Sequence, residues 1–236
     1  MSDIQTHCAA IHKAIKAMPH QNLSDPLTFT DLPCPSPLPL PHQRFAFKET
    51  DGITLFKYMG RSQFLELQQR IENKNFLKGF ETLYLYGTSG SGKSHLLAAL
   101  VYHLIREGKR VLYIPHCYDL MMNPLRTMRK ACQFAYYDSP LFGTIEHLDD
   151  VDALICFLER DPDVYIIVDQ VNALEFIDND RHKEQKTQAS AWLDLMRSSH
   201  RYMFSSSANE DYNREAHRKL QGISIIPTFG GMSQVR

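Results

Sequence analysis

The segment that decides the fold is Gly87-Thr88-Ser89-Gly90-Ser91-Gly92-Lys93-Ser94. It follows the short apolar run Thr82–Tyr86 and precedes Ser94–Arg106, whose leucines recur at the spacing of one helix face. Its glycines allow the backbone to curl until successive N–H groups point at one anion. Every fixed position matches the pattern Gly-x-x-x-x-Gly-Lys-Ser/Thr. The segment therefore predicts a phosphate-binding loop between a strand and a helix.

Two side chains of this loop have expected roles with a nucleotide and Mg²⁺. Lys93 reaches the β- and γ-phosphates and is placed among the catalytic residues, and the Ser94 hydroxyl coordinates the metal. Every residue of Gly87–Ser94 is an expected nucleotide contact, and so is His95, the next residue. Packing beside the start of the helix is the alternative for His95.

A second magnesium ligand is expected at Asp169, which directly follows the apolar run Val164–Val168. Ligands of open α/β sheets bind at the carboxyl ends of the strands. The next residue is Gln170, where many ATPases of this kind carry a glutamate base. An amide orients water but accepts no proton. We therefore expect that Gln170 positions the attacking water, that hydrolysis is slow, or that another acid such as Glu175 contributes.

A third catalytic residue is expected after the strand Arg201–Ser206. In P-loop ATPases with a strand inserted between the loop strand and the metal strand, the inserted strand ends in a polar residue that faces the γ-phosphate. Asn209 suits this role, because its amide bonds both a phosphate oxygen and water. Ser206 or Ser207 could take its place.

Strands and helices alternate from about Arg44, which predicts a parallel α/β sheet. The five expected strands are Thr82–Tyr86, Arg110–Pro115, Val164–Val168, Arg201–Ser206 and Ile223–Ile226. By analogy with ATPases that carry the inserted strand (the ASCE type), we expect a three-layer P-loop NTPase fold with five parallel strands in the order 5-1-4-3-2.

Composition and charge narrow the function classes. The 236 residues are 43% hydrophobic and carry 26 Lys+Arg against 27 Asp+Glu, a formal net charge of −1. Binding of nucleic acid through bulk positive charge is therefore not indicated. We see no signal peptide and no apolar run near the ~20 residues of a membrane span. The five scattered cysteines indicate reduced thiols rather than a disulfide framework.

The N-terminal part differs from the rest of the chain in its amino-acid composition. Met1–Pro19 has its apolar residues on one helix face, and either a packed amphipathic arm or an unanchored terminus fits this pattern. Seven of the chain's 12 prolines lie between Pro19 and Pro41, which predicts an extended linker. We therefore divide the chain into an arm and Pro-rich linker, residues 1–43, and an NTPase domain, residues 44–236, whose C-terminal lid is expected to be truncated.

Several motifs together resemble the NTPase domain of Crinkler-type effectors. They are the loop with Lys93–Leu100, together with Phe56–Arg61, Arg110–Pro115, Val168–Leu174 and Phe204–Asn209. The resemblance covers roughly Thr54 to Ser233. It implies an ATP-binding domain of the STAND/AAA-like group, and the Asp169-Gln170 pair is usual there. It also implies a downstream effector domain or host protein as partner, and secretion followed by action in a host cytoplasm or nucleus.

Three functions remain open at this point. The first is Mg²⁺-dependent ATP hydrolysis that drives a switch or motor for a partner. A second copy of the chain, in a homo-oligomer, is one candidate for that partner. ATP is favoured over GTP because the family binds ATP and no Asn-Lys-x-Asp guanine motif is present. The second is a nucleotide-binding regulatory module with negligible hydrolysis. The third is a helicase-loader-like AAA+ ATPase, although Arg126, Arg129 and Lys130 are too few for a basic stripe.

Overall fold

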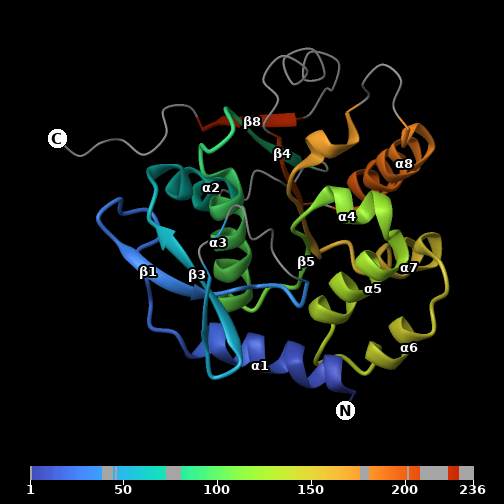
Figure 1. Ribbon diagram of the computed structural model, residues 1–236, viewed down its shortest axis with the longest axis horizontal. Helices are drawn as coiled ribbons and strands as arrows, with labels where there is room; N and C mark the ends of the chain where they lie inside the picture. Colours follow the sequence, from blue (N-terminus) through green and yellow to red (C-terminus); the bar gives the residue numbers. More distant parts are fainter. Residues whose placement is uncertain are drawn as a thin grey trace.

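The computed structural model describes residues 2–38, 45, 47–72, 81–175, 181–200, 202–207 and 223–228. These residues build two sheets (Figure 1). One is antiparallel and comes from the N-terminal part of the chain, and the other is parallel and carries the phosphate loop. No helix in the described ranges is both long and apolar enough to span a bilayer.

The larger sheet contains β4 (Glu81–Tyr86), β5 (Val111–Ile114), β6 (Tyr165–Val168), β7 (Tyr202–Ser207) and β8 (Ile223–Pro227). Its order is β5-β6-β7-β4-β8, and each neighbouring pair is parallel. Read from β8, this is the order 5-1-4-3-2 expected from the sequence. The α/β class is confirmed.

Helices cover both faces of this sheet. They are α3 (Lys93–Arg106), α4 (Cys117–Met122), α5 (Pro124–Ala135), α6 (Phe142–Glu146), α7 (Val151–Leu158) and α8 (Lys183–Ser199). Successive residues of a strand point to opposite faces. Val111 and Tyr113 of β5 accordingly join a buried cluster with α3, whereas Leu112 and Ile114 join a second cluster with α4, α5, α7 and α8. The described core therefore has three layers.

The smaller sheet was not expected from the sequence. It consists of β1 (Phe29–Pro33), β2 (Phe47–Thr50) and β3 (Ile53–Met59) in the order β1-β3-β2. Asp51 and Gly52 connect β2 to β3 with φ values of 51° and 73°. An Asp-Gly pair between two strands is a strong hairpin signal, because both turn residues need positive φ. That signal was present in the sequence.

The N-terminal arm packs against the core. It forms α1 (Asp3–Ala17), and Cys8, Ile11 and Ile15 are buried in the cluster that contains α3. In Figure 1, α1 runs along the bottom of the molecule beneath α3 and α5. Gln5 Nε2 donates to the Tyr137 carbonyl at 2.9 Å, which ties the start of α1 to the end of α5. The packed-arm alternative is therefore confirmed.

The described part of the Pro-rich stretch is not a detached linker, and that prediction is wrong for residues 33–38. β1 pairs with β3, and the Cys34 N–H donates to the Thr54 carbonyl at 2.8 Å. Leu32, Cys34 and Leu38 are buried. Burial of the apolar residues between the prolines is more favourable than the loss of the hydrogen bonds that prolines cannot donate, because these residues fill the core beside β3. Residues 39–44 lie outside the described residues, and the boundary at residue 43 stays a prediction.

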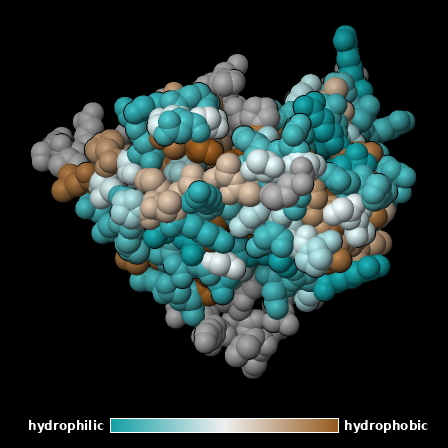
Figure 2. Space-filling model, turned by 90° about the horizontal axis from the view of Figure 1, so that it is seen from below, coloured by the Kyte–Doolittle hydropathy of each residue, from teal (hydrophilic) through white to brown (hydrophobic). Residues whose placement is uncertain are grey.

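The remaining N-terminal element, α2 (Ser62–Glu72), buries Phe64 and Leu67. It lies within the helix Arg61–Lys74 that apolar spacing predicts. On the face that Figure 2 shows, hydrophilic residues cover most of the surface, and the apolar ones are scattered among them.

Removing a buried side chain of α1 tests whether the arm is part of the core. Ile15 is fully buried, so Ile15→Ala is expected to lower the free energy of unfolding by about 2–5 kcal/mol. Urea denaturation followed by circular dichroism measures the change. Lys13→Ala, at an exposed position of the same helix, is the control and is expected to change it by less than about 0.5 kcal/mol. Equal effects of the two substitutions would show that α1 does not stabilise the domain.

Candidate phosphate-binding site

The loop after β4 has the backbone that its glycines predict. Gly90 and Gly92 have φ values of 80° and 82°, a region that side chains with a Cβ rarely adopt. The Ser91 N–H donates to the Thr88 carbonyl at 3.2 Å, and α3 begins with the bond from Leu96 N–H to the Gly92 carbonyl. The loop therefore turns tightly from the strand into the start of a helix, where backbone N–H groups are available to an anion.

The ammonium group of Lys93 lies inside this turn. Its Nζ donates to the carbonyls of Gly87 and Thr88, each at 2.8 Å, and to Ser91 Oγ at 3.0 Å. The side chain is 7% exposed. Lys93 thus holds a positive charge within the loop, and a phosphate that enters the loop meets it there. Ser94, the first-turn hydroxyl, is also buried.

Thr228, the residue after β8, fastens the loop from the neighbouring strand. Its hydroxyl donates to the Tyr86 carbonyl at 2.8 Å and lies 2.9 Å from Ser91 Oγ. A Cβ on Gly87 would stand 2.6 Å from Thr228 Oγ1, so this approach requires glycine at position 87. Sequence reasoning did not identify Thr228, although its place directly after the fifth strand was a possible signal.

Arg61 is a second residue that sequence reasoning did not assign to the site. Its Nη1 donates to the Ser91 carbonyl at 2.5 Å, and its guanidinium lies over Gly92. Burial lowers the pKa of Arg61 somewhat, but an arginine remains charged at neutral pH. Arg61 therefore adds a second positive charge beside the loop and links it to the start of α2.

Asp169 and the loop lie at the same edge of the sheet. Val168 pairs with Ser205 of β7, and Tyr86 pairs with Ser207 of the same strand, so Asp169 and Gly87 follow the strands on either side of β7. The Asp169 N–H donates to the Ile114 carbonyl at 2.9 Å, which fixes the backbone at this point. The side chain is 1% exposed.

Two neutral groups lie near the Asp169 carboxylate. Burial, and after it the charge of Asp169, raises the pKa of the Cys117 thiol and that of the Tyr113 hydroxyl. Both groups therefore stay protonated around neutral pH. An anionic oxygen ligand among neutral neighbours, together with the Ser94 hydroxyl, is a donor set that suits Mg²⁺.

Gln170 turns the chain away from β6. It is 4% exposed and has a φ of 63°, in the left-handed region. A non-glycine residue in this region persists where its surroundings hold it. The conformation leads into the 3₁₀ turn η2 (Val171–Leu174). Gln170 is thus fixed at the edge where the sequence predicts a water-positioning residue, and that role stays a prediction.

The His95 ring packs against two aromatic rings beside the start of α3. It lies 4.3 Å from the Phe45 ring and 6.3 Å from the Phe56 ring, measured between centroids. Burial, and secondarily the charge of Arg61, lowers the pKa of His95 to about 4. These ring contacts fit the packing alternative for His95, whereas its contact with a nucleotide stays a prediction. The remaining predicted site residue, Asn209, lies outside the described residues.

Comparison with known proteins gives partial similarities. No family model matches the chain. Over 78 residues it is 35% identical to chromosomal replication initiator protein DnaA 2 of Protochlamydia amoebophila, a match that covers 29% of this chain and 17% of that protein. The chain therefore spans less than a fifth of this relative's length.

Two solved structures match part of the chain at low identity and low TM-score. AMPPCP-bound DnaA from Aquifex aeolicus has 17% identity and a TM-score of 0.39, covering 72% of this chain and 47% of that one. DnaI has 15% identity and a TM-score of 0.38, covering 73% of this chain and 81% of that one. The proteins named here are not Crinkler-type effectors, so that resemblance stays an expectation from sequence motifs.

The Thr228 hydroxyl can be tested by a substitution of nearly the same shape. Thr228→Val removes the side-chain bonds to Tyr86 and Ser91, whereas the Thr228 N–H still donates to the Tyr86 carbonyl at 2.9 Å. We expect a loss of about 0.5–1.5 kcal/mol in the free energy of unfolding, measured by denaturant titration. Thr228→Ser keeps the hydroxyl and serves as the control. A valine variant as stable as the serine variant would show that the hydroxyl does not fasten the loop.

His95 predicts a pH dependence of stability. Its pKa is about 4 in the folded chain against 6.5 for an ordinary histidine. Between these values the unfolded chain binds a proton that the folded chain does not, so stability is retained above pH 6.5 and falls as the pH drops toward 4. His95→Phe keeps an aromatic ring beside Phe45 and removes this titration. Urea titrations at several pH values are expected to show a shallower acid loss in the variant, and parallel curves would contradict the shifted pKa.

Proposed function

We propose that this chain binds Mg·ATP and hydrolyses it, as an AAA+-like P-loop module of the kind found in replication initiators and helicase loaders. The observation that carries the proposal is the loop itself. Three of its oxygen atoms hold the Lys93 ammonium inside a turn of backbone N–H groups. A loop that concentrates one positive charge and several N–H donors in this way fits the phosphates of a nucleotide.

The two sides of the site take different tasks. Lys93 donates hydrogen bonds to the β- and γ-phosphates in place of the loop oxygens it now contacts. Ser94 and Asp169 hold Mg²⁺, which supplies Lewis-acid neutralisation of the charge on the transferring phosphoryl group. Arg61 adds charge on the α2 side of the loop, and Thr228 keeps the loop closed on the β8 side. The backbone of residues Gly87–Ser94 lines the phosphates.

Gln170 and Asn209 are the proposed water-positioning and γ-phosphate-sensing residues. Gln170 has a left-handed backbone and is buried at the carboxyl edge of the sheet. An amide carbonyl accepts a hydrogen bond from water but takes no proton, which favours a slow reaction. Such a reaction suits a protein whose nucleotide state acts as a switch.

The initiator-like part of the proposal rests on the 35% identity to DnaA 2. That protein is named as a replication initiator, so DNA is the proposed partner class. Assembly of several copies of the chain on DNA is compatible with the absence of bulk positive charge. An effector domain downstream, as the Crinkler motifs imply, has no comparable support. We therefore prefer the DNA-linked function.

The first experiment measures ATP binding by calorimetry with and without Mg²⁺, beside a phosphate-release assay. Lys93→Ala is expected to abolish detectable binding and to reduce phosphate release by about 100-fold or more, as loss of a preorganised charge at a phosphoryl group does. Lys57→Ala removes an exposed lysine of β3 and is the matched control. Unchanged ATP binding in Lys93→Ala would overturn the assignment of the loop.

Further variants separate the steps. Asp169→Asn is expected to weaken the Mg²⁺ dependence of binding, and Gln170→Ala to slow phosphate release while ATP still binds. Adding single-stranded DNA is expected to stimulate phosphate release by the unmodified chain. Release that DNA does not change would contradict the initiator-like part and leave the ATPase part intact. ATP binding without any release would instead support the regulatory module.

A further inference from the structure

A second candidate site lies on α5, away from the nucleotide loop. A pocket of about 450 Å³ is lined by Asn123, Pro124, Leu125, Arg126, Arg129, Lys130 and Gln133. This volume falls within the range of small-ligand sites, about 300–1,000 Å³. The residues of the pocket come from α5 and its N-cap, so one helix builds it.

Positive charge gathers in this pocket, and none of the described residues supplies a counterion. Arg126, Arg129 and Lys130 form no ion pair with any residue in the described ranges. The sequence of α5 contains no aspartate or glutamate. In a chain with a net charge of −1, three unpaired cations within five residues are an unusual local excess. Such an excess favours an anionic ligand.

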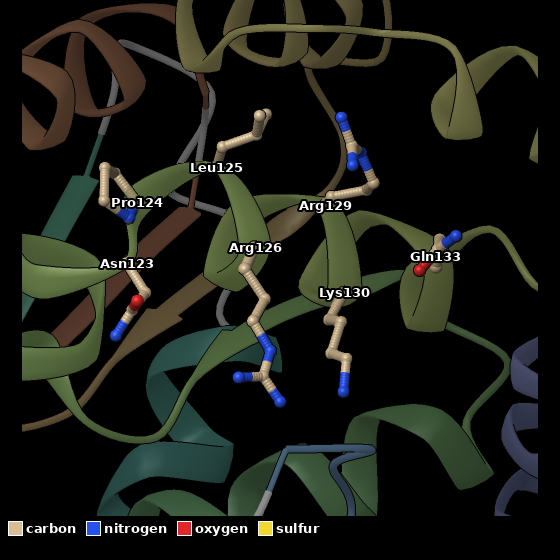
Figure 3. Close-up of a pocket in the computed structure, with 7 residues that line it drawn as sticks. All are labelled: Asn123, Pro124, Leu125, Arg126, Arg129, Lys130 and Gln133. Carbon is tan, nitrogen blue, oxygen red and sulfur yellow. The ribbon is translucent and has the colours of Figure 1, made fainter.

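The spacing of the polar residues forms one stripe. Arg126, Lys130 and Gln133 stand at positions i, i+4 and i+7, which share one face of a helix. Figure 3 shows Arg126 and Lys130 extending side by side from α5, whereas Arg129 points the other way. Arg129 Nη2 donates to the Leu148 carbonyl at 2.7 Å, so Arg129 supplies charge from a fixed position. The neighbouring side chains of Arg126 and Lys130 therefore present two cations on the same side of α5.

The start of α5 adds to this field. Asn123 makes no side-chain cap bond, and Pro124 occupies the first turn. The first-turn N–H groups of a helix have no acceptor within the helix, and its N-terminus carries partial positive charge. Both effects attract an anionic ligand, as the cations do.

Gln133 is an independent sign of a ligand. It is 6% exposed, and its side-chain amide forms no hydrogen bond with any part of the chain that the structure describes. Its amide atoms are not among the fully buried unpaired atoms of the described residues, so the small exposed part of Gln133 includes its amide. The exposure that Gln133 keeps is toward the pocket that it lines. Its unused donors and acceptor suit a polar group on a bound molecule.

We propose that the α5 pocket is a second anion site, which binds a small molecule carrying several phosphate groups through Arg126, Lys130 and Gln133. This inference does not depend on the nucleotide loop. No aromatic side chain of the described residues lines the pocket, and single-stranded nucleic acid usually needs aromatic rings on which its bases stack. The three contact residues also span only about 10 Å of helix, at 1.5 Å per residue. A compact polyphosphate fits this length better than a nucleic-acid strand.

The experiment measures binding of inorganic tripolyphosphate by calorimetry to the full chain carrying Lys93→Ala, in which the nucleotide loop contributes least. Arg126→Gln with Lys130→Gln is expected to weaken binding at least about tenfold, because two charge-assisted contacts are lost. The matched control is Lys48→Gln with Lys57→Gln, which removes the same charge from exposed positions of the smaller sheet. This control is expected to retain most of the affinity.

Gln133→Leu supplies a second readout that a purely structural role would not give. Replacing an unpaired buried amide by an apolar group is expected to leave the melting temperature unchanged or raise it, while tripolyphosphate binding weakens. A fall in melting temperature with unchanged binding would overturn the role of Gln133. No tripolyphosphate binding, or equal losses in both double variants, would overturn the site. Tight binding of single-stranded DNA through Arg126 and Lys130, with none of tripolyphosphate, would also overturn it.

Discussion

The shape of the phosphate loop depends on the buried ammonium group of Lys93. A charge taken out of water is stable only with acceptors around it. The carbonyls of Gly87 and Thr88 and the hydroxyl of Ser91 supply them, and the loop must curl to bring all three to one point. Thr228 and Arg61 then contact the outside of the curl, at Ser91. The loop is thus set by one internal charge and braced from two elements that are distant in sequence.

These braces connect the two sheets of the molecule. Arg61 lies two residues after the end of β3, and Thr228 directly follows β8, so the loop is bonded to a residue next to each sheet. His95 extends the same junction, because its ring packs among Phe45 and Phe56 one residue after the loop ends. A change in the conformation of the loop on nucleotide binding would alter its contacts with Arg61 and Thr228, and through them both sheets. This arrangement suits a domain whose nucleotide state is read by something else.

Much of this architecture is visible in the sequence, and the parts that are not have physical reasons. The loop, the run before Asp169 and the five parallel strands follow from local patterns, because strands buried on both faces read as continuous apolar runs. The order of the strands follows from the analogy with ATPases that carry the inserted strand. The smaller sheet was missed because prolines dominate the segment around β1. Pairing with β3 tolerates them, and Leu32 and Cys34 fill the core. Arg61 and Thr228 were missed because long-range contacts leave no local pattern. By sequence alone Arg126, Arg129 and Lys130 are too few for a basic stripe, and the structure adds Gln133, which lines the same pocket and makes no hydrogen bond to the described residues.

The bond between Thr228 and Ser91 joins residues 137 positions apart. A contact of such long sequence separation forms late, because the loss of chain entropy on closing the intervening segment precedes any gain. During synthesis the octapeptide after β4 therefore leaves the ribosome well before the strand that fastens it. The nascent chain therefore passes through a stage in which the residues of the phosphate loop have been synthesised but have not reached their final conformation. Competence to bind a nucleotide should then arise abruptly, when β8 joins the sheet beside β4.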